Sequence, residues 1–304
     1  MKTKIVYVLV SNDADCYYEQ TILSTYSLRQ FNPDAVVEVV CDLDTYATLV
    51  DTRYHLTEYV DRIICVEVPT LYSLMQKSRY LKTKLRELIT GDFLYLDSDT
   101  IICGSLDEID HCSEELAAVR DKNRPGQFSR LSGWPFVVAK DVGWQDELKG
   151  EPYYNGGVMY AKDSPIAHQL YAKWHDCWLQ CVDKGISTDQ TGLCMANKML
   201  SHPIKNIPDR WNCQINADGI LFTDDALVIH YFCNKYEQYL LSRASVQETI
   251  KQMGTIPPFV KEFIANPKLL FASPSELSKV RMKQIFQPLY RLFRFFKSFI
   301  QNVK

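Results

Sequence analysis

The chain has 304 residues, of which 46% are hydrophobic and 23% are charged, with 12 Gly and 13 Pro. This composition predicts a folded globular protein and excludes disordered, collagen-like and low-complexity chains. The formal net charge of −3 argues against general binding of nucleic acid.

The first hundred residues alternate between short apolar runs and helical patterns. Four runs rich in apolar and β-branched side chains predict strands: 5–10, 36–41, 62–68 and 93–96. Helices are predicted between them over 19–30 and 71–89, and Gly91 suits the end of the second helix. Because the strands are apolar throughout, we expect a parallel sheet with helices on both faces.

After residue 100 this alternation weakens. Residues 120–152 are rich in Gly, Pro and Trp and predict an irregular loop. Its aromatic side chains either form the wall of a ligand site or hold the loop on the core: Phe128, Trp134, Phe136 and Trp144. A helix is predicted over 165–183, a strand over 226–230 and short helices over 241–280. The predicted units are an α/β domain (1–240), a helical appendage (241–278) and a C-terminal segment (279–304).

Two carboxylates directly follow the fourth predicted strand, in the sequence Asp97-Ser98-Asp99. The carboxyl ends of parallel strands meet at the edge of the sheet where α/β proteins bind ligands. Paired carboxylates there suit a hard divalent cation that also accepts phosphate oxygens. Asp and Ser are common in turns as well, so this motif alone leaves a metal site and a polar turn equally open.

Three later motifs place polar groups where they could join this site: Asn155-Gly156-Gly157, Asp189-Gln190 and His230. The paired glycines allow close approach of the backbone. The histidine ends a predicted strand, so it reaches the same sheet edge and is a candidate third ligand beside the two carboxylates. Each motif taken alone also fits a structural role.

In order and approximate spacing, the four motifs resemble those of glycosyltransferase family 8: residues 94–99, 155–158, 189–190 and 229–231. The resemblance covers residues 3–236 and identifies a divergent, bacterial-type member. It implies the GT-A nucleotide-sugar transferase fold, an α/β architecture with a Rossmann-like, mostly parallel central sheet flanked by helices. A C-terminal helical extension follows this fold here. The activity implied is that of a retaining, metal-dependent hexosyltransferase.

The resemblance also implies roles for individual residues. Asp97, Asp99 and His230 look like the ligands of Mn²⁺ or Mg²⁺. Gln190 matches the family residue under the anomeric carbon of the donor, and Asp189 beside it contacts the sugar. The implied binding residues for a UDP-sugar donor are Asn12, Asp13, Tyr17, Arg79, Lys82, Ser98, Asn155, Gly156 and Lys235.

Some of these residues carry a qualification. Arg79 and Lys82 match basic positions near the diphosphate, and they also fit a solvated helix face. Lys235 stands where the family has a Gly and a Lys-Pro-Trp run that contacts the diphosphate, so the sequence departs from the family pattern there.

The C-terminal segment differs from the rest of the chain in charge. No acidic residue follows Glu276, and seven basic residues lie beyond it, which leaves an acidic body and a basic tail. Its apolar side chains recur at steps of three and four: Ile285, Leu289, Leu292, Phe296, Phe299 and Val303. This pattern predicts a helix lying in an anionic membrane interface, with docking on the acidic body or a dimer contact as the alternatives.

We therefore expect an enzyme that transfers a hexose with retention to a glycan or lipid-linked acceptor, in surface polysaccharide or lipopolysaccharide biosynthesis. The opening apolar run is too short for a signal peptide and no segment has the length of a membrane span, so we expect a cytoplasmic protein peripherally associated with the inner face of the cell membrane. The alternatives are a self-glucosylating, glycogenin-like protein and a non-enzymatic sugar-binding module. A nucleotidyltransferase is disfavoured because residues 11–15 contain no Gly for a phosphate loop.

Overall fold

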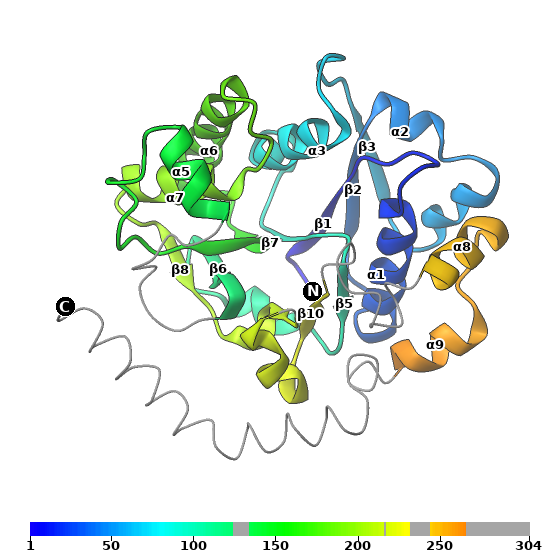
Figure 1. The fold of residues 1–304 in the computed structure, drawn as a ribbon. Coiled ribbons are helices and arrows are strands. Elements are labelled where there is room, and N and C mark those ends of the chain that lie inside the picture. The colour runs from blue at the N-terminus through cyan, green and yellow to red at the C-terminus, as the bar shows by residue number, and fades with distance from the viewer. Residues whose placement is uncertain (124–133, 216, 232–243, 266–304) are drawn as a thin grey trace.

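The computed structural model of this chain describes residues 1–123, 134–215, 217–231 and 244–265 (Figure 1). Within these ranges the strands are β1 (Lys4–Leu9), β2 (Val37–Asp42), β3 (Arg62–Val66), β4 (Phe93–Leu96), β5 (Thr100–Ile102), β6 (Leu116–Arg120), β7 (Tyr154–Ala161), β8 (Ile204–Asn206), β9 (Cys213–Gln214) and β10 (Val228–His230). The helices are α1 (Tyr17–Phe31), α2 (Leu43–Ala47), α3 (Leu74–Thr83), α4 (Leu85–Leu88), α5 (Trp134–Asp141), α6 (Pro165–Asp183), α7 (Gln190–Met199), α8 (Ala244–Met253) and α9 (Pro258–Ala265).

The described strands form a seven-stranded central sheet in the order β3-β2-β1-β4-β7-β6-β8. The four strands predicted from the first hundred residues pair in parallel, which confirms that expectation. Strand β7 adds a difference, because it runs antiparallel to both β4 and β6. A second, three-stranded sheet in the order β5-β10-β9 lies beside the first, and it carries β10 to the carboxyl end of β4.

Alternate side chains of the central strands enter two separate cores, because successive residues of a strand point to opposite faces. Ile5 and Leu94 belong to the core that also contains α1, whereas Val6 and Tyr95 belong to the core that contains α6 and α7. Figure 1 shows α1, α8 and α9 on one side of the sheet and α3 and α6 on the other. The sheet is therefore covered on both faces, as the apolar strands predicted.

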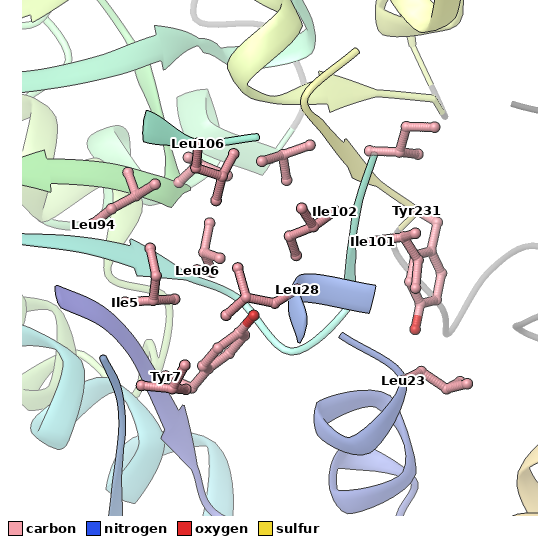
Figure 2. Close-up of a cluster of buried hydrophobic side chains, with 14 of the residues drawn as sticks. Ile5, Tyr7, Leu23, Leu28, Leu94, Leu96, Ile101, Ile102, Leu106 and Tyr231 are labelled. Carbon is pink, nitrogen blue, oxygen red and sulfur yellow. The ribbon is translucent and has the colours of Figure 1, made fainter. Parts of the chain in front are cut away.

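The first core continues into the C-terminal helices. Figure 2 shows Ile5, Leu94 and Leu96 of the sheet in one cluster with Leu28 of α1 and Ile102 of β5. Buried side chains of α8, α9 and the turn between them join the same cluster: Val246, Ile250, Ile256, Val260 and Ile264. Burying each of these side chains contributes roughly 1.5–3 kcal/mol.

The helix predicted over 71–89 is wrong in two respects. The helical residues begin at Leu74, because Ser73 and Gln76 form a reciprocal capping box that sets the start of α3. They are also interrupted at Lys84, where φ is −95° and ψ is −1°, so that α3 and α4 are separate. Gly91 adopts the expected left-handed conformation with φ of 77°, two residues beyond the Ile89 cap of α4.

The irregular loop predicted over 120–152 contains helix α5. Pro135 lies in its first turn, where the missing N–H is tolerated, and the Gly and Trp content hid this pattern. Trp144 is buried in the second core, so it holds this region in place and is not available to stack on a sugar. Phe136 is exposed. Phe128 and the side chain of Trp134 lie outside the described residues.

None of the helices within the described ranges combines the length and the apolar character needed to cross a bilayer. Residues 279–304, predicted as a membrane-associating helix, lie outside those ranges.

Candidate active site

The structure brings the three predicted metal ligands together at one edge of the sheet. Asp97 and Asp99 lie between β4 and β5, and His230 ends β10. Strand β10 pairs antiparallel with β5, with His230 opposite Thr100, so the register places the imidazole beside both carboxylates. One ligand atom from each residue lies within 4.8 Å of the others. His230 Nε2 is 3.0 Å from Asp99 Oδ1 and 3.9 Å from Asp97 Oδ2.

The two oxygens of Asp97 have different neighbours. Oδ1 accepts hydrogen bonds from Lys82 Nζ at 3.0 Å and from the Tyr95 hydroxyl at 2.5 Å. Oδ2 lies on the side of His230. Burial by itself raises the pKa of Asp97, but the nearby cations, Lys82 above all, lower it to about 2. The carboxylate is therefore ionised at neutral pH. Lys82 itself is buried, which excludes the solvated helix face for this residue.

Opposing effects act on the pKa of His230. Burial lowers this pKa, while the Asp99 and Asp97 carboxylates raise it, and the net shift is upward. When no metal ion is bound, Nε2 carries a proton and donates it to the Asp99 carboxylate. A metal ion held between these three side chains therefore has to replace that proton.

Gly157 leaves room beside this cluster. A Cβ atom at this position would lie 2.4 Å from His230 Cε1, 2.6 Å from Asp97 Oδ2 and 2.9 Å from Asn155 Oδ1. The backbone is engaged as well, because Asp97 N donates to Gly157 O at 2.7 Å. Two carboxylates and an imidazole thus surround a space that only glycine leaves open. This donor set fits a divalent cation.

Arg79 and Asp189 form an ion pair near the cluster. Arg79 Nε and Asp189 Oδ1 are 3.1 Å apart, although they are not aligned as a hydrogen bond. Within the described part of the chain, Asp189 Oδ2 is buried without a hydrogen-bond partner. The Trp174 indole donates to the Asp189 carbonyl at 2.9 Å, which positions the start of α7. Gln190 is the first residue of that helix, and its side chain is half-buried.

Asn155 is held inside the site by several hydrogen bonds. Its Oδ1 accepts from Gly157 N at 2.9 Å and from Asn212 Nδ2 at 3.0 Å. Its Nδ2 donates to Asp121 Oδ1 at 3.2 Å, and its second N–H is the group that could reach a sugar. A Cβ atom on the neighbouring Gly156 would be 3.6 Å from Lys82 Nζ, so that ammonium borders the start of β7.

The loop after β1 is ordered by Asp15. This carboxylate accepts from the backbone N–H groups of Asn12 and Tyr17 at 2.9 and 3.0 Å. One helical turn later, the Thr21 hydroxyl donates to Tyr17 O at 2.8 Å and lies 2.9 Å from the Ser98 hydroxyl. The predicted nucleotide-binding loop is therefore connected to the predicted metal motif through α1.

Helix α8 contacts the same loop. Lys251 Nζ donates to the backbone oxygen of Asp13 at 2.6 Å. A pocket of about 400 Å³ lies here, lined by residues 14–17 and by Gln247, Glu248 and Lys251. The Asp13 carboxylate is largely exposed, 3.6 Å from Arg53. Helix α8 thus borders the loop of Asn12, Asp13 and Tyr17, which the family resemblance implies to be donor-binding residues.

Two residues of this network escaped the sequence-based prediction. Asp121 and Asn212 contact Asn155, yet each looks like an ordinary turn residue in a single sequence. Asp121 lies inside the irregular loop predicted over 120–152, and Asn212 lies outside every predicted element. Lys235, predicted to contact the diphosphate, lies outside the described residues.

Comparison with known proteins supports the fold. No protein-family model and no curated protein matches the sequence. Among solved structures, the chain is similar to galactosyltransferase LgtC in complex with donor and acceptor sugar analogues, with a TM-score of 0.54 and 18% identity over 88% of this chain and 100% of that chain. It is also similar to glycosyltransferase GlyE of Streptococcus pneumoniae TIGR4, with a TM-score of 0.51 and 17% identity over 88% of this chain and 65% of that chain. At these identities the likeness concerns the fold alone. The chain therefore has the GT-A fold that its resemblance to glycosyltransferase family 8 predicted.

Proposed function

We propose that this chain is a metal-dependent glycosyltransferase that transfers a hexose from a UDP-sugar, with retention, to a glycan or lipid-linked acceptor. The observation that carries the proposal is the cluster of Asp97, Asp99 and His230 at the edge of a GT-A sheet, with the space left by Gly157 beside it. We place the enzyme in surface polysaccharide or lipopolysaccharide biosynthesis, a pathway that follows from the family resemblance.

The cluster would hold Mn²⁺ or Mg²⁺ through Asp97, Asp99 and His230. The imidazole favours Mn²⁺, because Mg²⁺ prefers ligands that are all oxygen. Bound there, the ion would supply positive charge to the departing diphosphate. We propose that Lys82 contributes to the same charge, since its buried ammonium lies 3.0 Å from Asp97 Oδ1 in the cluster.

The sugar would be oriented by side chains on the α7 side of the site. Two groups are proposed to bond its hydroxyls: Asp189 Oδ2, which has no hydrogen-bond partner among the described residues, and the second N–H of Asn155. Gln190 is proposed to support the reacting face of the donor, with the acceptor attacking from the side that the diphosphate leaves. The gain from such groups is orientation of the reactants. A second LgtC structure, similar to this chain with a TM-score of 0.55 and 19% identity, carries an active-site glutamine-to-glutamate change, which agrees with this role.

The proposal is tested by UDP release. The full chain is incubated with Mn²⁺ and one UDP-hexose at a time, with and without oligosaccharide acceptors, and melting temperatures are recorded in parallel. A true donor should raise the melting temperature and yield UDP. UDP and labelled protein formed without acceptor would indicate self-glycosylation. Donor binding without any UDP release would favour a sugar-binding module.

Metal binding should weaken as the pH falls. The pKa of Asp97 is about 2, so this carboxylate stays ionised, whereas the raised pKa of His230 means that a proton competes for Nε2. Below that pKa, the affinity for Mn²⁺ should fall about tenfold per pH unit, because one proton leaves for each ion bound. Titration of Mn²⁺ by electron paramagnetic resonance measures the slope. A His230→Gln variant should bind more weakly and lose this slope, and an unchanged slope in that variant would contradict the assignment.

We further propose that residues 279–304 bind an anionic membrane. The support is their sequence, which combines seven basic residues with a Phe-rich apolar stripe. Each basic residue near the surface contributes about 1 kcal/mol, so deleting the segment should lower vesicle affinity at least about 100-fold. Cosedimentation with phosphatidylglycerol vesicles compares the full chain with a chain ending at residue 278. Equal binding of the two chains would refute the proposal.

A further inference from the structure

A chain of buried side chains lies behind the imidazole of His230. Asn212 Oδ1 is 3.2 Å from His230 Nδ1, and Asn212 Nδ2 is 3.0 Å from Asn155 Oδ1. Asn155 Nδ2 is in turn 3.2 Å from Asp121 Oδ1. Asn212 is 0% exposed and His230 is 1% exposed. These hydrogen bonds link the predicted metal ligand to the predicted sugar-binding amide through the fully buried Asn212, and only Asp121 at the far end is half-buried.

The direction of every hydrogen bond in this series of side chains follows from the bonds at Asn155, the end away from His230. The Gly157 N–H can only donate, and it bonds one atom of Asn155 at 2.9 Å, so that atom is the amide oxygen. The Asp121 carboxylate requires the same orientation, because it accepts from the Asn155 nitrogen. The Asn155 oxygen then needs a donor from Asn212, which is the amide nitrogen.

The orientation of the Asn212 amide in turn determines the protonation of His230 Nδ1. With its nitrogen on Asn155, Asn212 presents its oxygen to His230 Nδ1, so Nδ1 must carry a proton. Nε2 faces the Asp99 and Asp97 carboxylates, so it also carries a proton until a metal ion displaces it, and the metal-bound imidazole then keeps its remaining proton on Nδ1. Asn212 therefore determines which nitrogen of the imidazole is left to bind a metal ion.

The backbone holds Asn212 in this position. It directly precedes β9, which pairs in parallel with β10 in the register His230↔Gln214. Its carbonyl accepts from Asn123 Nδ2 at 2.9 Å, and its N–H donates to the Asp209 carbonyl at 3.0 Å. A side chain held in this way can orient another without rearrangement, as partners behind metal-binding histidines generally do.

We propose that Asn212 is a positioning residue that locks His230 in the Nδ1–H tautomer and so aims the Nε2 lone pair at the metal position. The inference rests on the proposed function for the presence of the metal. The tautomer can be measured independently of that function. Asn212 makes no contact with a reacting atom in this assignment.

The experiment compares three versions of the full chain. Asn212→Leu removes both hydrogen bonds. Asn212→Asp keeps an acceptor for Nδ1 but loses the donor to Asn155. Asn206→Leu, at an exposed asparagine of β8, is the control. Nitrogen-15 spectra of the imidazoles, recorded with saturating MgCl₂ as a diamagnetic ion and assigned with His230→Gln, report which nitrogen carries the proton, and titration with MnCl₂ gives the affinity.

With the ion bound we expect the proton on Nδ1, hydrogen-bonded to residue 212, in the wild-type protein, in Asn206→Leu and in Asn212→Asp. In Asn212→Leu the Nδ1–H resonance should lose the shift caused by this hydrogen bond, and the affinity for Mn²⁺ should fall about 10- to 100-fold. Asn212→Leu with an unchanged Nδ1–H resonance and an affinity within about twofold of wild type would overturn the proposal.

A wild-type spectrum with the ion bound and the proton on Nε2 would also overturn it, even if Asn212→Leu does not fold. These outcomes are separate from catalysis. If the tautomer is as stated and no UDP-sugar is turned over, the proposed function fails and this inference stands.

Discussion

Replacing Asp97 and Asp99 together with asparagine is expected to lower UDP-sugar turnover at least about 1,000-fold. The two carboxylates supply most of the negative charge at the cluster with His230, and asparagine keeps their size while removing that charge. A bound metal contributes several kcal/mol to stabilising charge on a departing diphosphate, and 1,000-fold corresponds to about 4 kcal/mol. The measurement is UDP release at saturating donor and Mn²⁺.

The control for this variant is Asp146→Asn, at an exposed carboxylate far along the chain from the motif. It should leave the rate within about twofold of wild type, since isolated surface charges have small effects. Melting temperatures of both proteins separate loss of activity from loss of folding. A folded Asp97→Asn, Asp99→Asn protein that keeps full activity in the presence of EDTA would remove the proposed role of the metal.

Replacing Gly157 with alanine is expected to disrupt the metal site and the local packing at the same time. The added Cβ atom would lie 2.4 Å from His230 Cε1 and 2.6 Å from Asp97 Oδ2, so the imidazole or the carboxylate must move. Both groups are held by hydrogen bonds, and overpacking of this kind costs typically about 1–3 kcal/mol of folding free energy. Affinity for Mn²⁺ should fall at least about 10-fold, because the ligands no longer converge.

The adjacent glycine provides a matched control. In Gly156→Ala the nearest atoms to the new Cβ are Lys82 Nζ at 3.6 Å and Leu193 Cδ2 at 3.8 Å, which are ordinary contacts. This variant should keep its affinity for Mn²⁺, and its stability should be unchanged or slightly higher, by up to about 1 kcal/mol. Metal titration and thermal melting of the two variants test the difference. Equal losses of Mn²⁺ affinity in both variants would show that β7 does not tolerate a methyl group at either glycine, and would contradict a specific need for space beside the cluster.

Much of the fold was predictable because strands and helices impose local periods on the sequence. The apolar runs 5–10, 36–41, 62–68 and 93–96 correspond to β1, β2, β3 and β4. In β1, β2 and β4 the apolar character reflects burial on both faces, since successive side chains enter different cores, whereas the side chains of the edge strand β3 are half-buried or exposed. The break between α3 and α4 and the presence of α5 were not predicted, because a local kink and an aromatic-rich helix have no distinct period.

The antiparallel position of β7 was not predictable from its own residues. A buried strand has the same apolar composition whichever way its neighbours run. Its place between β4 and β6 depends on pairings such as Leu96↔Val158, between residues far apart in the chain. The same pairing brings Gly157 to Asp97.

For the candidate site, the chemical identity of its groups was visible in the sequence. Carboxylates after a strand, a histidine at the end of another strand and an Asn-Gly-Gly sequence are recognisable by residue type and by position at element ends. What no local pattern could reveal is which of these groups meet. His230 and Asp99 are 131 residues apart, and their contact follows from the register of β10 against β5.

Asn212 illustrates the remaining gap. In the sequence it is one more turn-forming residue, whereas in the folded chain it connects Asn155 to His230 and sets the polarity of both. Residue type and periodicity therefore determined the elements and the kinds of chemistry available to this chain. Strand register and close packing alone decided the partners, because hydrogen bonds and metal ligands depend on distances of a few ångströms that sequence separation does not encode.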